Sequence, residues 1–114
     1  SIVFNNGAYS LYTNGILVGS YLHPADTNYV DMHLGFSGYE FSGNWAGELD
    51  ELSVWEKPFT ANELRSLMCK KVTPAHPDYC KLKLYFRFDE GAGNVIENSL
   101  GAGNLILGNV GWTV

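Results

Sequence analysis

The dipeptide Asn14-Gly15 is the sequence feature that most constrains the fold, because it joins two runs rich in strand-forming residues. Both central positions of a type I′ turn need a positive φ, and asparagine and glycine adopt that conformation at the lowest cost. Ala-Tyr-Ser-Leu-Tyr-Thr precedes the turn, and Ile-Leu-Val-Gly-Ser follows it. The sequence therefore predicts a tight antiparallel hairpin within residues 8–20, and Ser1–Phe4 reads as the end of a further strand.

Several later segments also have strand patterns. Residues 30–37, 48–56 and 82–88 alternate between two faces, and shorter apolar runs lie at 95–97, 105–107 and 111–114. Glycine-rich turns separate the runs at 89–93 and 99–104. The segment 48–56 carries apolar residues on both faces, which predicts a central strand that is covered at least in part on both sides.

A change of pattern after this strand predicts one short helix near residues 60–68. Pro58 ends the strand, and Thr60-Ala-Asn-Glu63 has the composition of a capping box. Phe59 and Leu64 stand where a hydrophobic staple would place them. About eight strands and one helix favour an all-β fold, an antiparallel β-sandwich or jelly roll.

The composition sets limits on the partners. The chain has 114 residues, of which 46% are hydrophobic, so it predicts a single packed domain over 1–114. A formal net charge of −5 argues against nucleic acid or an anionic membrane as partner. No apolar run approaches the roughly 20 residues that a membrane-spanning helix needs, so membrane insertion is not expected.

Three stretches are similar to segments of one known family and lie in the same order. Residues 11–19 read LYTNGILVG, residues 47–55 read GELDELSVW, and residues 85–93 read YFRFDEGAG. They resemble the segments LYVNGxLVG, GxIDEVRVW and YYRFDEGSG of the laminin-G-like, concanavalin A-like lectin-glucanase jelly-roll family. The resemblance implies a concanavalin-like antiparallel sandwich. The family's opening segments, FDGxxDYV and FTISAWV, have no counterpart, so 1–114 is expected to be one laminin-G-like domain that lacks its N-terminal strands.

An incomplete sandwich has a physical consequence. Missing strands leave unpaired edges and an open apolar face. We therefore expect a protein partner, or a sister segment of the same precursor, to supply the missing strands. The function expected from this reading is a non-catalytic structural or adhesive module, extracellular or at the cell surface, within a larger assembly. The alternative is a carbohydrate-binding, lectin-like module that takes a glycan.

Two cysteines, Cys69 and Cys80, flank a short proline-containing loop. A disulfide between them would hold this loop, which has little apolar content, and would imply an oxidising compartment. The alternative is a pair of unbonded thiols.

The resemblance also implies a calcium site at Asp50, Asp89 and Asn98. Calcium takes six to eight oxygen ligands, and carboxylates and amide carbonyls supply them. The alternative is that Asp50 caps backbone groups and that Glu51 is solvated.

Aromatic residues in loop regions are the candidate ligand-binding residues. Tyr29, Tyr39 and Phe41 could stack on a sugar ring or anchor a protein partner, and the alternative is ordinary turn packing. Catalysis is not expected. Glu48-Leu49-Asp50-Glu51 differs from the Glu-x-Asp-x-x-Glu spacing of related glycosidases, and the three histidines are scattered.

Overall fold

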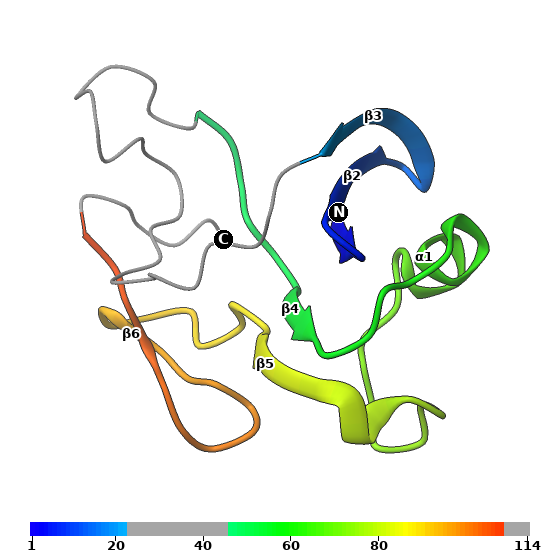
Figure 1. Ribbon diagram of the computed structural model, residues 1–114. Helices are drawn as coiled ribbons and strands as arrows, with labels where there is room; N and C mark the ends of the chain where they lie inside the picture. Colours follow the sequence, from blue (N-terminus) through cyan, green and yellow to red (C-terminus); the bar gives the residue numbers. More distant parts are fainter. Residues whose placement is uncertain (23–45, 109–114) are drawn as a thin grey trace.

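The computed structural model describes residues 1–22 and 46–108, which form small antiparallel sheets and one short α-helix (Figure 1). The first sheet contains β1 (Ile2–Asn5), β2 (Ala8–Thr13) and β3 (Ile16–Leu22), in that order. The other two sheets pair β4 (Leu52–Trp55) with β5 (Leu82–Phe86), and β6 (Val95–Ile96) with β7 (Leu105–Ile106). The helices are α1 (Ala61–Leu67) and the 3-10 helix η1 (Tyr79–Lys81). Most of the regular secondary structure of the described residues is thus strand, as an all-β class requires.

The predicted hairpin is confirmed. Asn14 and Gly15 have φ values of 51° and 69° and connect β2 to β3. A second turn of the same kind, Asn6 (49°) and Gly7 (78°), connects β1 to β2. We did not predict this second turn, although it has the same Asn-Gly signal. Two tight turns therefore build a three-stranded meander from the first 22 residues.

The capping box of α1 is also confirmed. The Glu63 backbone N–H donates to Thr60 Oγ1 at 3.3 Å, and the Thr60 backbone N–H donates to Glu63 Oε2 at 2.7 Å. Phe59 and Leu64 flank this first turn and are both buried. The helix covers 61–67, within the predicted 60–68.

The predicted strand 48–56 is shorter in the structure. Glu51 has a φ of 52°, in the left-handed region that interrupts an extended strand, so β4 begins only at Leu52. Among the described strands β4 pairs with β5 alone, and Val54 is exposed. The described residues therefore give β4 one neighbouring strand, and the central position with cover on both sides stays a prediction. The predicted strand 82–88 ends likewise at Phe86, before Phe88, whose φ is 55°.

The core of the described residues lies around β5. Its buried apolar members are Phe59, Leu64, Leu82, Tyr85, Phe86 and Ile96. Trp55 packs edge-on against Phe59, with 5.1 Å between ring centroids. The N-terminal meander contributes no side chain to this set, so the described residues hold one small core beside a separate sheet.

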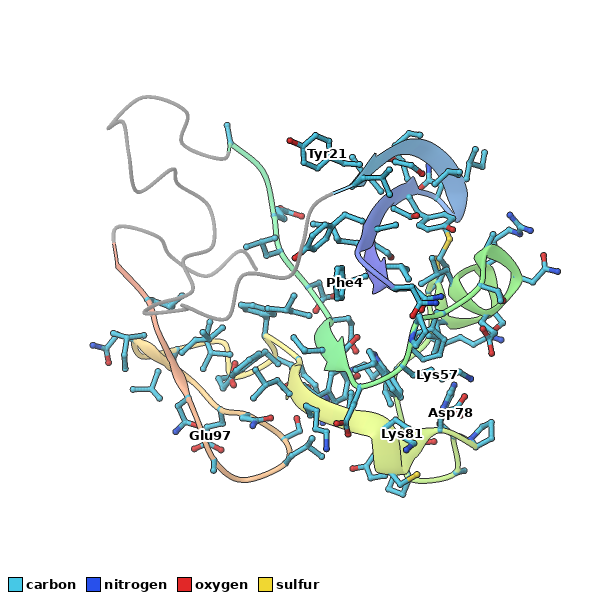
Figure 2. All side chains as sticks on the ribbon, in the orientation of Figure 1. Phe4, Tyr21, Lys57, Asp78, Lys81 and Glu97 are labelled. Carbon is cyan, nitrogen blue, oxygen red and sulfur yellow. The ribbon has the colours of Figure 1, made fainter. Side chains whose placement is uncertain are left out.

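Cys69 and Cys80 are both free and exposed in this structure, and the disulfide between them stays a prediction. The loop between them is held by other contacts. Lys57 Nζ donates to Asp78 Oδ2 at 2.6 Å, and Figure 2 shows the two side chains side by side. The Val72 N–H donates to the Tyr85 hydroxyl at 3.0 Å, and the His76 ring lies 5.2 Å from the Trp55 ring. These contacts order the loop without a covalent bond, although its apolar content is low.

Some predictions fall outside the described residues: the strands at 30–37 and 111–114, and the candidate ligand-binding residues Tyr29, Tyr39 and Phe41. Within 1–22 and 46–108, no helix has the length and apolar character needed to cross a membrane.

Candidate functional site

Tyr85 is the centre of a polar cluster inside the small core. Its side chain is 3% exposed, and its hydroxyl donates to Glu51 Oε2 while accepting from the Val72 N–H. Burial, reinforced by the hydrogen bond to the Glu51 carboxylate, raises the pKa of Tyr85 to about 12. The hydroxyl therefore keeps its proton at neutral pH and links β5 to the loop and to the residue before β4.

Asn98 organises the turn on the other side of β5. Its Oδ1 accepts the N–H groups of Tyr85 at 3.0 Å and of Leu100 at 3.2 Å, and its Nδ2 donates to the Ala102 carbonyl. The side chain is 5% exposed. Its amide thus satisfies three backbone groups, two of them within the turn at 99–104.

The three predicted calcium ligands are engaged differently. Asp50 is exposed, whereas Asp89 pairs with Arg87 at 2.5 Å and with Lys71 at 3.7 Å. The oxygen of Asn98 is occupied by backbone N–H groups. Among the described residues, no three His, Cys, Asp or Glu side chains are grouped to hold a metal ion. Calcium binding stays a prediction from the resemblance.

A shallow hollow of about 300 Å³ lies between the cysteine loop and β5. Its lining includes Lys71, Val72, Thr73, Tyr79, Tyr85 and Arg87. The half-buried Tyr79 ring, the exposed Thr73 hydroxyl and two cationic side chains thus border one open surface, which can offer both stacking and hydrogen bonds to a ligand.

The N-terminal meander presents the most exposed apolar surface of the described chain. Ile2 pairs with Leu11, and Phe4 pairs with Tyr9, which in turn pairs with Tyr21. Paired residues project from the same side of a sheet, so these five side chains share one side, here named the apolar face. Ile2 is 72% exposed and Tyr21 is 67% exposed. Figure 2 shows Phe4 and Tyr21 on this sheet.

Among the described strands, none pairs with the outer edge of β1 in the same sheet. Ser1 and Tyr12 exchange two backbone hydrogen bonds of 2.8 Å, so Ser1 faces β2 with its N–H and C=O groups. Hydrogen-bonding direction alternates along a strand, so Val3 and Asn5 also face β2, and Ile2 and Phe4 point their backbone groups the other way. Among the described strands β1 pairs only with β2. Ile2 and Phe4 therefore offer two N–H and two C=O groups at the sheet edge.

The meander contains no charged residue. Residues 1–22 include no Asp, Glu, Lys, Arg or His, although the whole chain has twelve acidic and seven basic residues. Charges commonly protect sheet edges against pairing with other chains. An uncharged edge beside an exposed apolar face is suited to protein contact.

The sequence indicated some of these features and missed others. An open edge near Ser1–Phe4 was expected. The contact of Arg65 with the hairpin turn was not predicted. Arg65 Nη1 donates to the carbonyl of Gly15, 50 residues earlier in the chain, at 2.7 Å. The Tyr85–Glu51 bond was also missed, because alternation along each strand says nothing about which distant side chains meet.

Comparison of the chain with models of protein families, with curated proteins and with solved structures finds no match.

Proposed function

We propose that this chain is a non-catalytic, extracellular structural or adhesive module, a jelly-roll sandwich of laminin-G-like type that another polypeptide completes. The observation that supports the proposal most is the apolar face of the N-terminal sheet, exposed beside the open edge of β1. The resemblance of three ordered segments to the laminin-G-like family adds to it.

The size of the uncovered surface supports the same conclusion. Ile2, Leu11 and Tyr21 are 72%, 48% and 67% exposed. Full burial of one large apolar side chain stabilises a protein by about 1.5–3 kcal/mol. Covering several of them is comparable with the roughly 5–15 kcal/mol that stabilises a whole domain. A partner that covers this face would therefore change the stability of the module substantially.

Unfolding of the isolated 114-residue chain tests the proposal. We expect a broad transition in urea and strong binding of a hydrophobic dye, because Ile2 and Leu11 of the apolar face are 72% and 48% exposed. Changing Leu11 and Tyr21 to serine should lower dye binding. Val54→Ser is the matched control, since Val54 is also exposed but lies on β4. A monodisperse monomer that unfolds in one cooperative step and binds little dye would contradict the proposal.

A carbohydrate-binding role is the second candidate, and the hollow beside Tyr79 favours it. Sugar rings stack on aromatic side chains, and Thr73 and Arg87 could bond their hydroxyl groups. A glycan array with the completed module should then give a reproducible signal that Tyr79→Ala or Tyr39→Ala abolishes. Tyr21→Ala is the control on the apolar face. An array without a signal, or one insensitive to both substitutions, would count against this role.

A further inference from the structure

We propose that the polypeptide that pairs with the edge of β1 is a second copy of this chain, bound by β1 in antiparallel orientation with Val3 opposite Val3 of the partner. This inference rests on the proposed function, because it names the partner that the open edge receives. The two three-stranded sheets would join into one continuous sheet.

The register follows from the direction of the backbone groups. Ile2 and Phe4 point their N–H and C=O groups away from β2. In an antiparallel pair, two residues that face each other directly can exchange both hydrogen bonds. Placing Ile2 opposite Phe4 of the second copy, and Phe4 opposite its Ile2, satisfies every outward group of both residues. A two-fold axis then passes between the two Val3 residues, as in a closed isologous interface.

The side chains agree with this register. Ile2 and Phe4 both lie on the apolar face, and paired residues share a face. Each Ile2 would therefore meet a Phe4 ring of the other copy on the side that already carries Leu11 and Tyr9. The two apolar faces then form one continuous surface. Ile2 is 72% exposed, second only to Leu22 among the large apolar residues of the described chain, and it would pack against Phe4 of the other copy.

Charge and regular pairing together distinguish the edge of β1 from the other strand edges of the described chain. Every charged residue lies beyond residue 22, so two β1 strands meet without a like-charge contact despite the net charge of −5. The pairing of β1 with β2 has no bulge, whereas β2 and β3 are irregular between Leu11 and Tyr12. By contrast, β5 carries Lys83, which projects to solvent and pairs with Glu56. The edge of β1 is thus the regular and uncharged one.

Sedimentation of the full chain between about 10 µM and 1 mM covers the range of a weak dimer. We expect the average mass to rise across this range, from near that of one chain towards that of two. Changing both Ile2 and Phe4 to lysine should keep the chain monomeric, and changing both to glutamate should do the same. A mixture of the two variants should again form dimers, because opposite charges then face each other.

A third variant tests the register. In I2K/F4E each new lysine faces a new glutamate of the second copy, so this variant should dimerise with itself. In a register that opposes Ile2 to Ile2, or Phe4 to Phe4, like charges would meet and the variant would stay monomeric. A monomeric I2K/F4E therefore overturns the Val3-centred register.

A substitution that acts on the backbone shows whether the loss of dimers in the charged variants reflects misfolding. Phe4→Pro removes a donor that points outward and spares the bonds of β1 to β2, so it should abolish dimers while the circular dichroism of the sheet persists. A Phe4→Pro variant that still dimerises overturns the proposal.

The outcomes separate the two proposals. A wild-type chain that stays monomeric up to 1 mM, or that grows beyond two copies, overturns self-pairing. If such a monomer unfolds broadly and binds dye, the proposed function stands with a different partner. If it unfolds cooperatively and binds little dye, both proposals fail.

Discussion

At the scale of single residues, Asn98 stabilises the structure through its side-chain amide. The Oδ1 atom accepts hydrogen bonds from the N–H of Tyr85 in β5 and from the N–H of Leu100 in the following turn. A buried backbone N–H without an acceptor costs about 1–3 kcal/mol. The position that was expected to supply an oxygen to calcium therefore supplies it to the backbone.

Asn98→Ala should lower the free energy of unfolding by about 2–4 kcal/mol, because two N–H groups lose their acceptor. Urea denaturation followed by tryptophan fluorescence measures the change. Ser99→Ala is the control: the Ser99 N–H donates to the Tyr85 carbonyl at 2.8 Å, and that bond needs no side chain. A loss below about 0.5 kcal/mol in Asn98→Ala would mean that the turn does not depend on the amide.

At the scale of elements, the turn between β2 and β3 combines a backbone requirement with a tertiary contact. Gly15 has a φ of 69° and is buried by Arg65 of α1, which donates to its carbonyl. A Cβ atom at this position would overlap the Arg65 side chain. Glycine is therefore needed here for two reasons, of which only the first could be read from the sequence.

Gly15→Ala should destabilise the chain by about 2–3 kcal/mol, through the strained φ and the overlap with Arg65. Gly7→Ala is the matched control, since Gly7 has a φ of 78° but no neighbour within 4 Å of an added Cβ. It should cost only about 1 kcal/mol. When Arg65 is changed to alanine, the two glycine substitutions should cost the same in thermal unfolding. If Gly15→Ala and Gly7→Ala destabilise the chain equally with Arg65 in place, the contact between Arg65 and the turn does not contribute to stability.

The helix cap couples stability to acid. The hydrogen bond from Lys57, helped by the backbone and hydroxyl of Thr60, lowers the pKa of Glu63 to about 2. A carboxyl whose pKa is depressed in the folded state contributes stability above its ordinary pKa, and that stability is lost as the pH falls through the folded value. The ordinary pKa of a glutamate side chain is 4.5, so the stability is lost between about pH 4.5 and about pH 2.

The urea midpoint of the wild type should therefore fall more steeply between pH 4.5 and pH 2 than that of Glu63→Gln. Glu97→Gln, which removes an exposed carboxylate outside the helix, should keep the wild-type slope. Parallel slopes for wild type and Glu63→Gln would show that this carboxylate does not couple folding to protonation.

Local and distant contacts explain what could be predicted. The Asn14-Gly15 turn and the Thr60–Glu63 cap depend on residues within a few positions, so their patterns are visible in the sequence. The start of β4 is different. Glu51 adopts its left-handed φ where its carboxylate accepts the hydroxyl of Tyr85, 34 residues later. For the candidate site, the open edge at Ser1–Phe4 was predictable from pattern and resemblance, whereas its register needed the pairing of β1 with β2.

At the scale of the whole molecule, the described chain divides into an uncharged part and a charged part. Residues 1–22 hold the uncharged meander. The second part contains α1 and the core around β5, with ion pairs such as Lys57–Asp78 and Lys83–Glu56. The Arg65 side chain bonds to the hairpin turn from this second part, and Figure 1 shows α1 near the hairpin of β2 and β3. Salt should therefore act mainly on the second part, because screening needs charges to act on.

The meander also has a consequence for the order of folding. Its strands pair residues that are close in the sequence, whereas β4 and β5 pair residues as distant as Leu52 and Phe86. Local pairings close small loops and form early. The uncharged edge of β1 is then present before the rest of the chain is folded, and partly folded chains can associate through it. We expect the refolding yield to fall as the protein concentration rises. The double substitution I2K/F4K should restore the yield. A refolding yield that does not depend on protein concentration would show that partly folded chains do not associate through this edge, whatever the folded chain binds there.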